Sequence, residues 1–323
     1  MSEGNHRVRA GIIGAGHMGR YHVAAYSELY HVDLVGVCDI DPKKTELAAA
    51  PFELPTYTDY HDLFGKVDVV SIAVPTHLHY PIARDVLEHG IHVLLEKPIT
   101  PTLDEARDLF RIAGERDLVL HVGHVERFNG AVQEMKKIVD RPYLVESRRI
   151  GPWTGRINDA GVVLDLLIHD LDIVLNLVGG EVVKLDVQGR KIRSDFEDLV
   201  TVQMEFESGT LATMLASRVS EEKIRTLTVH QPKAYVFLDY SSQEIHIHRQ
   251  AGSSSALTSQ HLSYRQESIV ERLFVHKGNP LKFEIQHFIE HAMDKSKHKL
   301  NTEQELRSLG LALEILAHLR DRQ

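Results

Sequence analysis

The chain has 323 residues, of which 43% are hydrophobic and 26% charged, with a net charge of −9 when His is counted as neutral. This length exceeds one ordinary hydrophobic core, so we expect two domains. The acidic total gives no long-range attraction to nucleic acid or to an anionic membrane. No segment approaches the ~20 uninterrupted apolar residues of a membrane span.

The polar amino terminus and the single cysteine bear on location and on metal chemistry. The first six residues lack the apolar stretch of a signal peptide, so we expect a cytoplasmic protein. Cys38 has no partner for an internal disulfide, which agrees with a reducing compartment. The 21 histidines show no recognisable ligand spacing, and we predict no metal site.

The first 125 residues alternate short aliphatic runs with amphipathic segments, which is typical of a parallel sheet with crossover helices. We expect strands at 8–13, 32–38, 67–74, 92–96 and 118–122, and helices at 18–30, 42–50, 80–89 and 103–116. Thr102 is a candidate cap for the last of these helices, with Glu105 three positions later. Right-handed connections then give a doubly wound α/β domain over residues 1–125.

The remaining residues, 126–323, predict an α+β domain. One helix is expected at 161–178, followed by antiparallel strands at 182–188, 199–207, 210–218, 225–230, 234–238 and 244–248. Glu207-Ser208-Gly209 indicates a hairpin between two of them. The segment 250–260, rich in Ser, Gly and Ala, is predicted to be a mobile loop. Helices at 281–294 and 303–321 end the chain, and they can pack back on the first domain.

A glycine motif follows the first expected strand. Gly14, Gly16 and Gly19 have the spacing that lets a strand turn sharply, brings backbone against a pyrophosphate, and packs a helix on a strand. Asp39 ends the second strand, where an acid binds the ribose hydroxyls of NAD and repels a ribose 2′-phosphate. Lys43 and Lys44 lie close enough in the sequence to leave NADP open.

Two further segments follow strands at the edge where open α/β sheets bind ligands. Pro75 and Thr76 come after one strand, and Glu96-Lys97-Pro98 after the next. A partly desolvated lysine beside a nicotinamide is able to hydrogen-bond a substrate hydroxyl and ease its deprotonation. The alternative is a solvated lysine before a turn.

The expected helix at 161–178 carries polar residues among aliphatic neighbours. Asp165, His169 and Asp172 stand four and three residues apart and therefore share one face. They form either a buried hydrogen-bonded link or a histidine poised to take a proton, with a carboxylate that fixes its tautomer or binds the same hydroxyl.

Together these motifs resemble the Gfo/Idh/MocA family of oxidoreductases, which includes glucose-fructose oxidoreductase and inositol dehydrogenase. The resemblance implies a Rossmann domain, a second domain with a large, mostly antiparallel open sheet, and assembly through that sheet into a homodimer or homotetramer. It implies that Lys97, Asp165 and His169 are catalytic, with His169 as the base, and that a cis peptide bond precedes Pro98. The expected NAD contacts are Gly14, Gly16, His17, Met18, Gly19, Asp39, Pro75, Thr76, His79, Glu96 and Lys97.

Within that family, residues 123–129, 148–156 and 278–282 resemble members that oxidise nucleotide sugars, with C3 of UDP-N-acetylglucosamine as the expected position of attack. The expected substrate contacts are Arg127, Asn129, Arg148, Arg156, Asp165 and His169. Arginines here, Arg149 among them, suit bidentate contacts to a diphosphate, with structural salt bridges as the alternative. A polyol or free-sugar dehydrogenase and a non-catalytic NAD-sensing protein are the other functions left open.

Overall fold

The computed structural model describes residues 7–155, 160–257, 262–294 and 302–321. The chain divides into two compact units. One comprises the residues up to Phe128 together with Asn279–Gly310, and the other comprises Asn129–Gly278 together with the residues from Leu311 onward.

The first unit contains a six-stranded parallel sheet in the order β3-β2-β1-β4-β5-β6. Its strands are β1 Val8–Ile13, β2 Val32–Cys38, β3 Thr56–Tyr57, β4 Val69–Ile72, β5 His92–Glu96 and β6 Leu120–Gly123. Short aliphatic runs form these strands because helices cover both faces, so that nearly every side chain is buried. The predicted doubly wound sheet is confirmed, and all the strands end at one edge.

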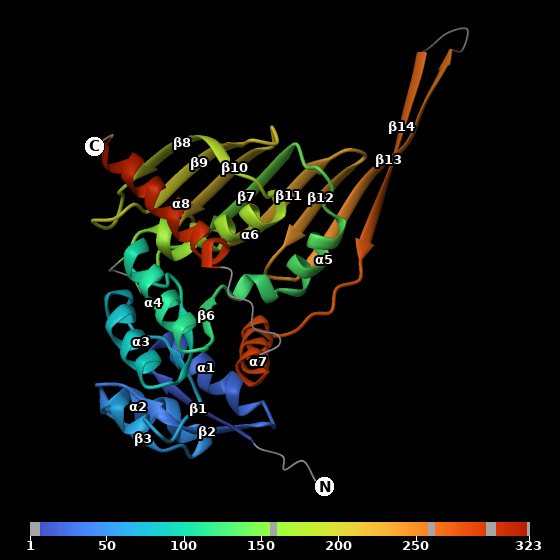
Figure 1. Cartoon of the computed structure of the whole chain (residues 1–323). Helices are drawn as coiled ribbons and strands as arrows, with labels where there is room; N and C mark the ends of the chain where they lie inside the picture. Colours follow the sequence, from blue (N-terminus) through green and yellow to red (C-terminus); the bar gives the residue numbers. More distant parts are fainter. Residues whose placement is uncertain (1–6, 156–159, 258–261, 295–301, 322–323) are drawn as a thin grey trace. The chain divides into compact units, whose positions relative to one another are not determined.

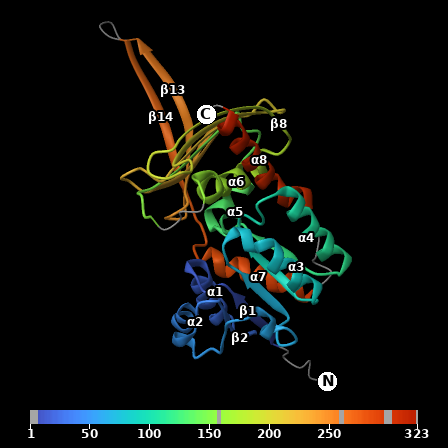
Figure 2. The ribbon, with the colours of Figure 1, turned by 90° about the vertical axis from the view of Figure 1, so that its left-hand side faces the viewer.

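Helices cover the two faces of this sheet. They are α1 His17–Ser27, α2 Pro42–Ala49, α3 His79–Glu88, α4 Leu103–Glu115 and α7 Pro280–Met293, with short 3-10 turns η1 Ala50–Phe52, η2 Tyr60–Leu63, η3 Thr76–Leu78 and η4 Val125–Phe128. Helix α1 contacts α2 and α7, whereas α3 packs on α4. Figure 2 shows α1 and α2 on one side of the strands, and α3 and α4 on the other. Thr102 caps α4 as predicted, because its Oγ1 accepts a hydrogen bond from Glu105 N.

The second unit contains an eight-stranded sheet in the order β14-β13-β12-β11-β7-β10-β9-β8. Its strands are β7 Leu144–Ile150, β8 Val182–Arg190, β9 Leu199–Phe206, β10 Leu211–Ser217, β11 Ile224–Gln231, β12 Ala234–Asp239, β13 Glu244–Leu257 and β14 Leu262–Leu273. Neighbouring strands are antiparallel except β7 and β10, which run parallel. The predicted large, mostly antiparallel sheet is therefore confirmed.

Helices pack on one face of the second sheet (Figure 1). They are α5 Gly130–Ile138, the π-helical turn η5 Val163–Leu167, α6 Ile168–Val178 and the carboxyl-terminal part of α8 Thr302–Asp321. Met135, Leu171 and Ile315 of these helices share one buried cluster with Val145 and Val202 of the strands. The alternating burial of β7, β9 and β10 leaves their other side chains on the face away from the helices.

The predicted mobile loop at 250–260 is wrong over residues 250–257, which continue β13 as far as Leu257, and residues 258–260 lie outside the described part. Beyond His248 this strand pairs with β14, with an irregularity between Gln250 and Gly252. This segment is rich in Ser and Gly, which do not favour strands. Backbone hydrogen bonds across the hairpin nevertheless hold it in strand conformation. In Figure 1 the β13–β14 hairpin extends beyond the end of β12.

Candidate functional site

The glycine turn between β1 and α1 uses its three glycines in three ways. Gly14 has φ +99°, and a Cβ there would lie 2.5 Å from the Ala73 carbonyl oxygen. A Cβ at Gly19 would lie 1.8 Å from the Gly14 carbonyl oxygen, because the helix packs directly on the turn. A Cβ at Gly16 would meet nothing within 4 Å, so this glycine faces open space. The turn therefore fits a ligand whose phosphates approach the backbone at Gly16.

The start of α1 is electrostatically suited to a phosphate ligand. Gly16 is the N-cap residue and offers no side chain to the first helical amides, and no acidic residue lies in the first turn. The exposed His17 and the half-buried Met18 follow it. Amide groups at a helix amino terminus, together with the helix dipole, bind phosphate.

Asp39 lies beside the glycine turn. Its carboxylate accepts hydrogen bonds from Ala15 N at 2.8 Å and from Asp41 N at 2.9 Å, and Gly14 N donates to the carbonyl of Cys38. These bonds fix the half-buried carboxylate at the end of β2. The arrangement fits a dinucleotide whose pyrophosphate lies on α1 and whose adenosine ribose lies on Asp39.

His79 is buried and joins two segments at the edge of the sheet. Its Nδ1 lies 2.9 Å from the Pro98 carbonyl oxygen, and its Nε2 lies 2.9 Å from the Val74 carbonyl oxygen. Both ring nitrogens therefore face backbone carbonyls, and the cofactor contact of His79 stays a prediction. Exposed Pro75 and half-buried Thr76 lie between the segments that His79 joins.

Glu96 turns toward α1. Its Oε1 lies 2.9 Å from His22 Nε2, and its Oε2 accepts a hydrogen bond from Lys97 N at 3.2 Å. Burial raises the pKa of this carboxyl, but the hydrogen bond and charge of His22, together with Lys97, outweigh burial and lower the pKa. Sequence reasoning missed His22, whose partner lies 74 residues away. These contacts let Glu96 support the backbone of Lys97, and its contact with the cofactor stays a prediction.

Lys97 follows β5 and is half-buried. The peptide bond that joins it to Pro98 is cis, as the family resemblance implied. Glu96 fixes the backbone of Lys97, and His79 fixes that of Pro98. The backbone is therefore fixed both at the lysine and at the proline that follows it, and this holds Lys97 at the carboxyl edge of the sheet.

Asp165 and His169 lie on one helical segment of the second unit. Asp165 belongs to the π-helical turn η5, and His169 to the first turn of α6. Both are half-buried, whereas Asp172, which was predicted to share their face, is only 2% exposed and accepts from Asn176 Nδ2. Single π turns occur frequently at functional sites. The segment therefore carries a carboxylate and an imidazole on residues that are both half-buried.

The loop at 190–198 holds the start of this segment. The Glu197 carbonyl accepts a hydrogen bond from Val162 N at 2.9 Å, and its Oε1 accepts one from Val163 N at 3.2 Å. Arg218 donates to Asp198 Oδ1 and to the Ala160 carbonyl, both at 2.8 Å. Sequence reasoning missed these contacts, because each joins residues 20 or more positions apart.

The predicted diphosphate ligands have other partners. Arg127 forms an ion pair with Glu305 at 2.6 Å. Arg149 is 2% exposed, pairs with Asp170 through Nε and Nη2 at 2.8 and 3.0 Å, and lies over the Tyr240 ring. Arg156 lies outside the described residues. For Arg149, the structural salt bridge is the correct alternative.

Arg148 and Asn129 also have positions that bear on the predicted site. Arg148 is exposed and precedes Arg149 on β7, so it points to the sheet face away from α6. The structure therefore separates Arg148 from Asp165 and His169. Asn129 is 2% exposed; its Oδ1 accepts from Ala131 N at the start of α5, and its Nδ2 donates to the Tyr240 carbonyl. These bonds give the Asn129 side chain a structural role at the start of α5.

Within the described residues, no group of three or more His, Cys, Asp or Glu side chains is arranged to hold a metal ion. None of the helices in the described ranges is both long and apolar enough to cross a membrane.

Comparison with known proteins gives matches in both units. Residues 8–124 match the model of an oxidoreductase family with an NAD-binding Rossmann fold, GFO_IDH_MocA, and residues 128–237 match the model of a GFO/IDH/MocA C-terminal domain. UDP-N-acetylglucosamine 3-dehydrogenase of Acidithiobacillus ferrooxidans is 36% identical over 248 residues, 76% of this chain and 79% of that protein.

A solved structure of UDP-N-acetylglucosamine 3-dehydrogenase from Acidithiobacillus ferrooxidans superposes with a TM-score of 0.85 at 30% identity, covering 97% of this chain and 98% of that one. A scyllo-inositol 2-dehydrogenase of Bacillus subtilis is 27% identical over 234 residues, 67% of this chain and 68% of that protein.

Proposed function

The chain belongs to the Gfo/Idh/MocA family of NAD-binding oxidoreductases, and on that premise we propose that it oxidises a secondary hydroxyl of a nucleotide sugar. The observation that carries the proposal is the glycine turn, where Gly16 faces open space at the amino terminus of α1 and Asp39 lies beside it. Function as an oxidoreductase acting on CH–OH agrees with the named relatives.

We propose NAD in preference to NADP as the cofactor. A ribose 2′-phosphate bound beside the Asp39 carboxylate would bring like charges together. Gly14, Gly16 and Gly19 would hold the pyrophosphate against α1, and Asp39 would bind the ribose hydroxyls. When bound, the nicotinamide supplies the hydride acceptor.

The proposed chemistry divides between Lys97, Asp165 and His169. His169 takes the proton of the sugar hydroxyl as general base, and Lys97 donates a hydrogen bond that stabilises the developing alkoxide. Asp165 holds the hydroxyl and the imidazole in register. The carbinol carbon loses hydride, so the product is a ketone. The support of Lys97 by Glu96 and of Pro98 by His79 agrees with a lysine that needs a fixed position.

For the substrate, we propose UDP-N-acetylglucosamine, oxidised at C3. Support comes from the relative of that activity, which is 36% identical and matches three quarters of the chain. We also propose a cytoplasmic homodimer or homotetramer. Arg156 stays a predicted ligand of the diphosphate.

The test is a screen for reduced nicotinamide by absorbance, with NAD and NADP each run against UDP-sugars and polyols. We expect turnover with NAD and a UDP-sugar. The variant Lys97→Met should lower kcat by about a hundredfold or more, the usual scale for a proton-transfer group, while the Kd for NADH changes little.

Lys137→Met, at an exposed lysine paired with Glu134, is the control and should leave kcat unchanged. Turnover of inositol alone would replace the proposed substrate by a polyol. If Lys97→Met raised the Kd for NADH as strongly as it lowered kcat, the catalytic role of Lys97 would be wrong.

A further inference from the structure

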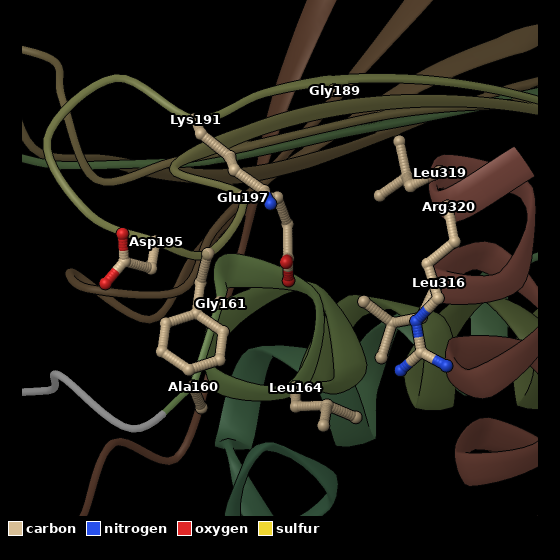
Figure 3. A pocket seen from close by; sticks show the side chains of 11 residues that line it. Ala160, Gly161, Leu164, Gly189, Lys191, Asp195, Glu197, Leu316, Leu319 and Arg320 are labelled. Carbon is tan, nitrogen blue, oxygen red and sulfur yellow. The ribbon is translucent and has the colours of Figure 1, made fainter. Parts of the chain in front are cut away.

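The second unit contains a cavity that the proposed chemistry does not use (Figure 3). Its volume is about 300 Å³, and it lies between the start of the segment that carries Asp165, the β8–β9 connection and the end of α8. Gly161 and Leu164 form one wall, immediately before Asp165 in the sequence. At the rise of a helix, ~1.5 Å per residue, Asp165 lies within one turn of that wall.

Basic and apolar side chains line the cavity. Lys191 reaches it from the β8–β9 connection and Arg320 from α8, so that the two cations come from opposite walls (Figure 3). Neither has a hydrogen-bond or ion-pair partner among the described residues. Leu164, Leu316 and Leu319 supply an apolar wall, and Phe196 stands at the rim, 37% exposed. Two uncompensated cations beside an apolar surface suit an anion that carries a ring.

Two acids, Asp195 and Glu197, also line the cavity. Asp195 is exposed, and in Figure 3 its carboxylate lies away from Arg320. Glu197 extends into the cavity, and burial raises the pKa of its carboxyl. A carboxyl group in this position is also suited to hydrogen-bond a ribose hydroxyl.

We propose that this cavity binds the nucleoside diphosphate of the substrate, with Lys191 and Arg320 on the phosphates, Glu197 on the ribose and Phe196 against the base. The proposal rests on the proposed nucleotide-sugar oxidation and replaces Arg127 and Arg149, which pair with Glu305 and Asp170. Because the sugar ring is bonded directly to the diphosphate, phosphates held here leave its hydroxyls within a few bonds of the cavity.

The test uses Lys191→Gln, Arg320→Gln and the double variant, with UDP and the UDP-sugar as ligands in calorimetry and steady-state kinetics. A charge-assisted hydrogen bond contributes enough for about a tenfold change in affinity. We expect about tenfold higher Kd for UDP in each single variant and about a hundredfold in the double. The Kd for NADH should stay unchanged, and kcat at saturating UDP-sugar should change less than about threefold.

Lys184→Gln on β8 and Arg141→Gln before β7 remove exposed cations that do not line the cavity, and they should leave UDP binding unchanged. Lys191 and Arg320 are exposed, so a urea midpoint equal to that of the parent chain should accompany each variant. Uridine should bind far more weakly than UDP, and pyrophosphate should compete with UDP in the parent chain.

The outcomes separate this proposal from the proposed function. If the parent chain oxidises a UDP-sugar and the double variant keeps its Kd for UDP and its KM, the subsite is wrong and the activity stands. If the parent chain reduces no cofactor but binds UDP through Lys191 and Arg320, the activity is wrong and the subsite stands. Failure of the parent chain to bind UDP would overturn the subsite outright.

Discussion

At the scale of single residues, chemically identical glycines serve the same turn for different reasons. Gly19 is required by the protein itself, because any Cβ would collide with the Gly14 carbonyl. A Cβ at Gly16 would meet nothing within 4 Å beyond its neighbours in the chain, so the packing of the protein does not require glycine there, whereas a phosphate bound on the turn would. This difference allows stability and cofactor binding to be separated by two substitutions of the same kind.

We predict that Gly16→Ala keeps the urea midpoint and raises the Kd for NAD by about tenfold or more, since the methyl group displaces a charged hydrogen bond worth ~1.5–3 kcal/mol. Gly19→Ala should lower stability by roughly 1–3 kcal/mol through overpacking, and lose NAD binding with it. Isothermal calorimetry and urea unfolding measure the two effects. Equal losses of stability in both variants, with unchanged NAD affinity in Gly16→Ala, would mean that this turn does not bind the phosphates of NAD.

The sequence predicted residues whose role depends on the local chain, and it failed where the partner is remote. The glycine spacing and the Thr102 cap each involve residues within a few positions, whereas the cis bond before Pro98 was implied by the family resemblance. Arg127 resembled a phosphate ligand until folding placed Glu305, 178 residues later, against it. An arginine in a sequence does not show whether its partner is a ligand or a carboxylate of the same chain.

At the scale of elements, β7 and α6 are joined by one buried ion pair. Arg149 and Asp170 are 2% and 1% exposed, and two hydrogen bonds join them. Ser147 is also buried on the face of β7 that carries Arg149. Polar residues therefore occupy both faces of this strand, and the alternation of apolar and polar residues that predicts a strand is absent. This explains why β7 was not predicted, whereas β1, β2 and β5, which bury aliphatic side chains, were predicted with the correct bounds.

We predict that Arg149→Met and Asp170→Leu each destabilise the second unit by about 3–5 kcal/mol, because each removes one member of a buried, doubly hydrogen-bonded ion pair. The double variant should be less destabilised than either single variant, since both charges are then absent. Urea unfolding followed by Trp153 fluorescence measures this.

Glu271→Leu, which breaks the exposed pair with Arg249, is the control and should cost less than about 1 kcal/mol. A double variant as unstable as the sum of the two single variants would mean that the pair itself contributes nothing beyond its separate side chains.

At the scale of the whole molecule, the chain passes between its two units three times. Helix α7 follows the second sheet in the sequence, yet its Ile285 and Phe288 lie in the core of the first unit with Val23 and Tyr26 of α1. Local patterns predicted α7 as an amphipathic helix. We expected that this helix can pack back on the first domain, but periodicity alone does not select that core, because the core is built from residues far earlier in the chain and its selection depends on complementary packing.

The sequence supplies one natural probe for each unit, since it contains a single cysteine and a single tryptophan. Cys38 ends β2 in the first unit and is 3% exposed; burial, followed by the nearby Asp59, Asp39 and Asp62, raises the pKa of its thiol to about 12. Trp153 lies in the second unit, with its ring 5.0 Å from the Arg218 guanidinium carbon. In the folded chain Cys38 is therefore both inaccessible and protonated, and unfolding of the first unit should expose it to thiol reagents.

We predict that NAD stabilises the first unit, whose unfolding Cys38 reports, and leaves the stability of the second unit unchanged. At a concentration of about 100 times its Kd, a ligand that binds only the folded form adds roughly 2.7 kcal/mol to the stability of its unit. Thiol labelling across a urea series should therefore move to higher urea with NAD, while the Trp153 fluorescence transition stays in place. In Gly16→Ala the same NAD concentration should give little protection. Equal shifts of both probes would show that the two units unfold as one, and an unmoved Cys38 transition would place NAD elsewhere.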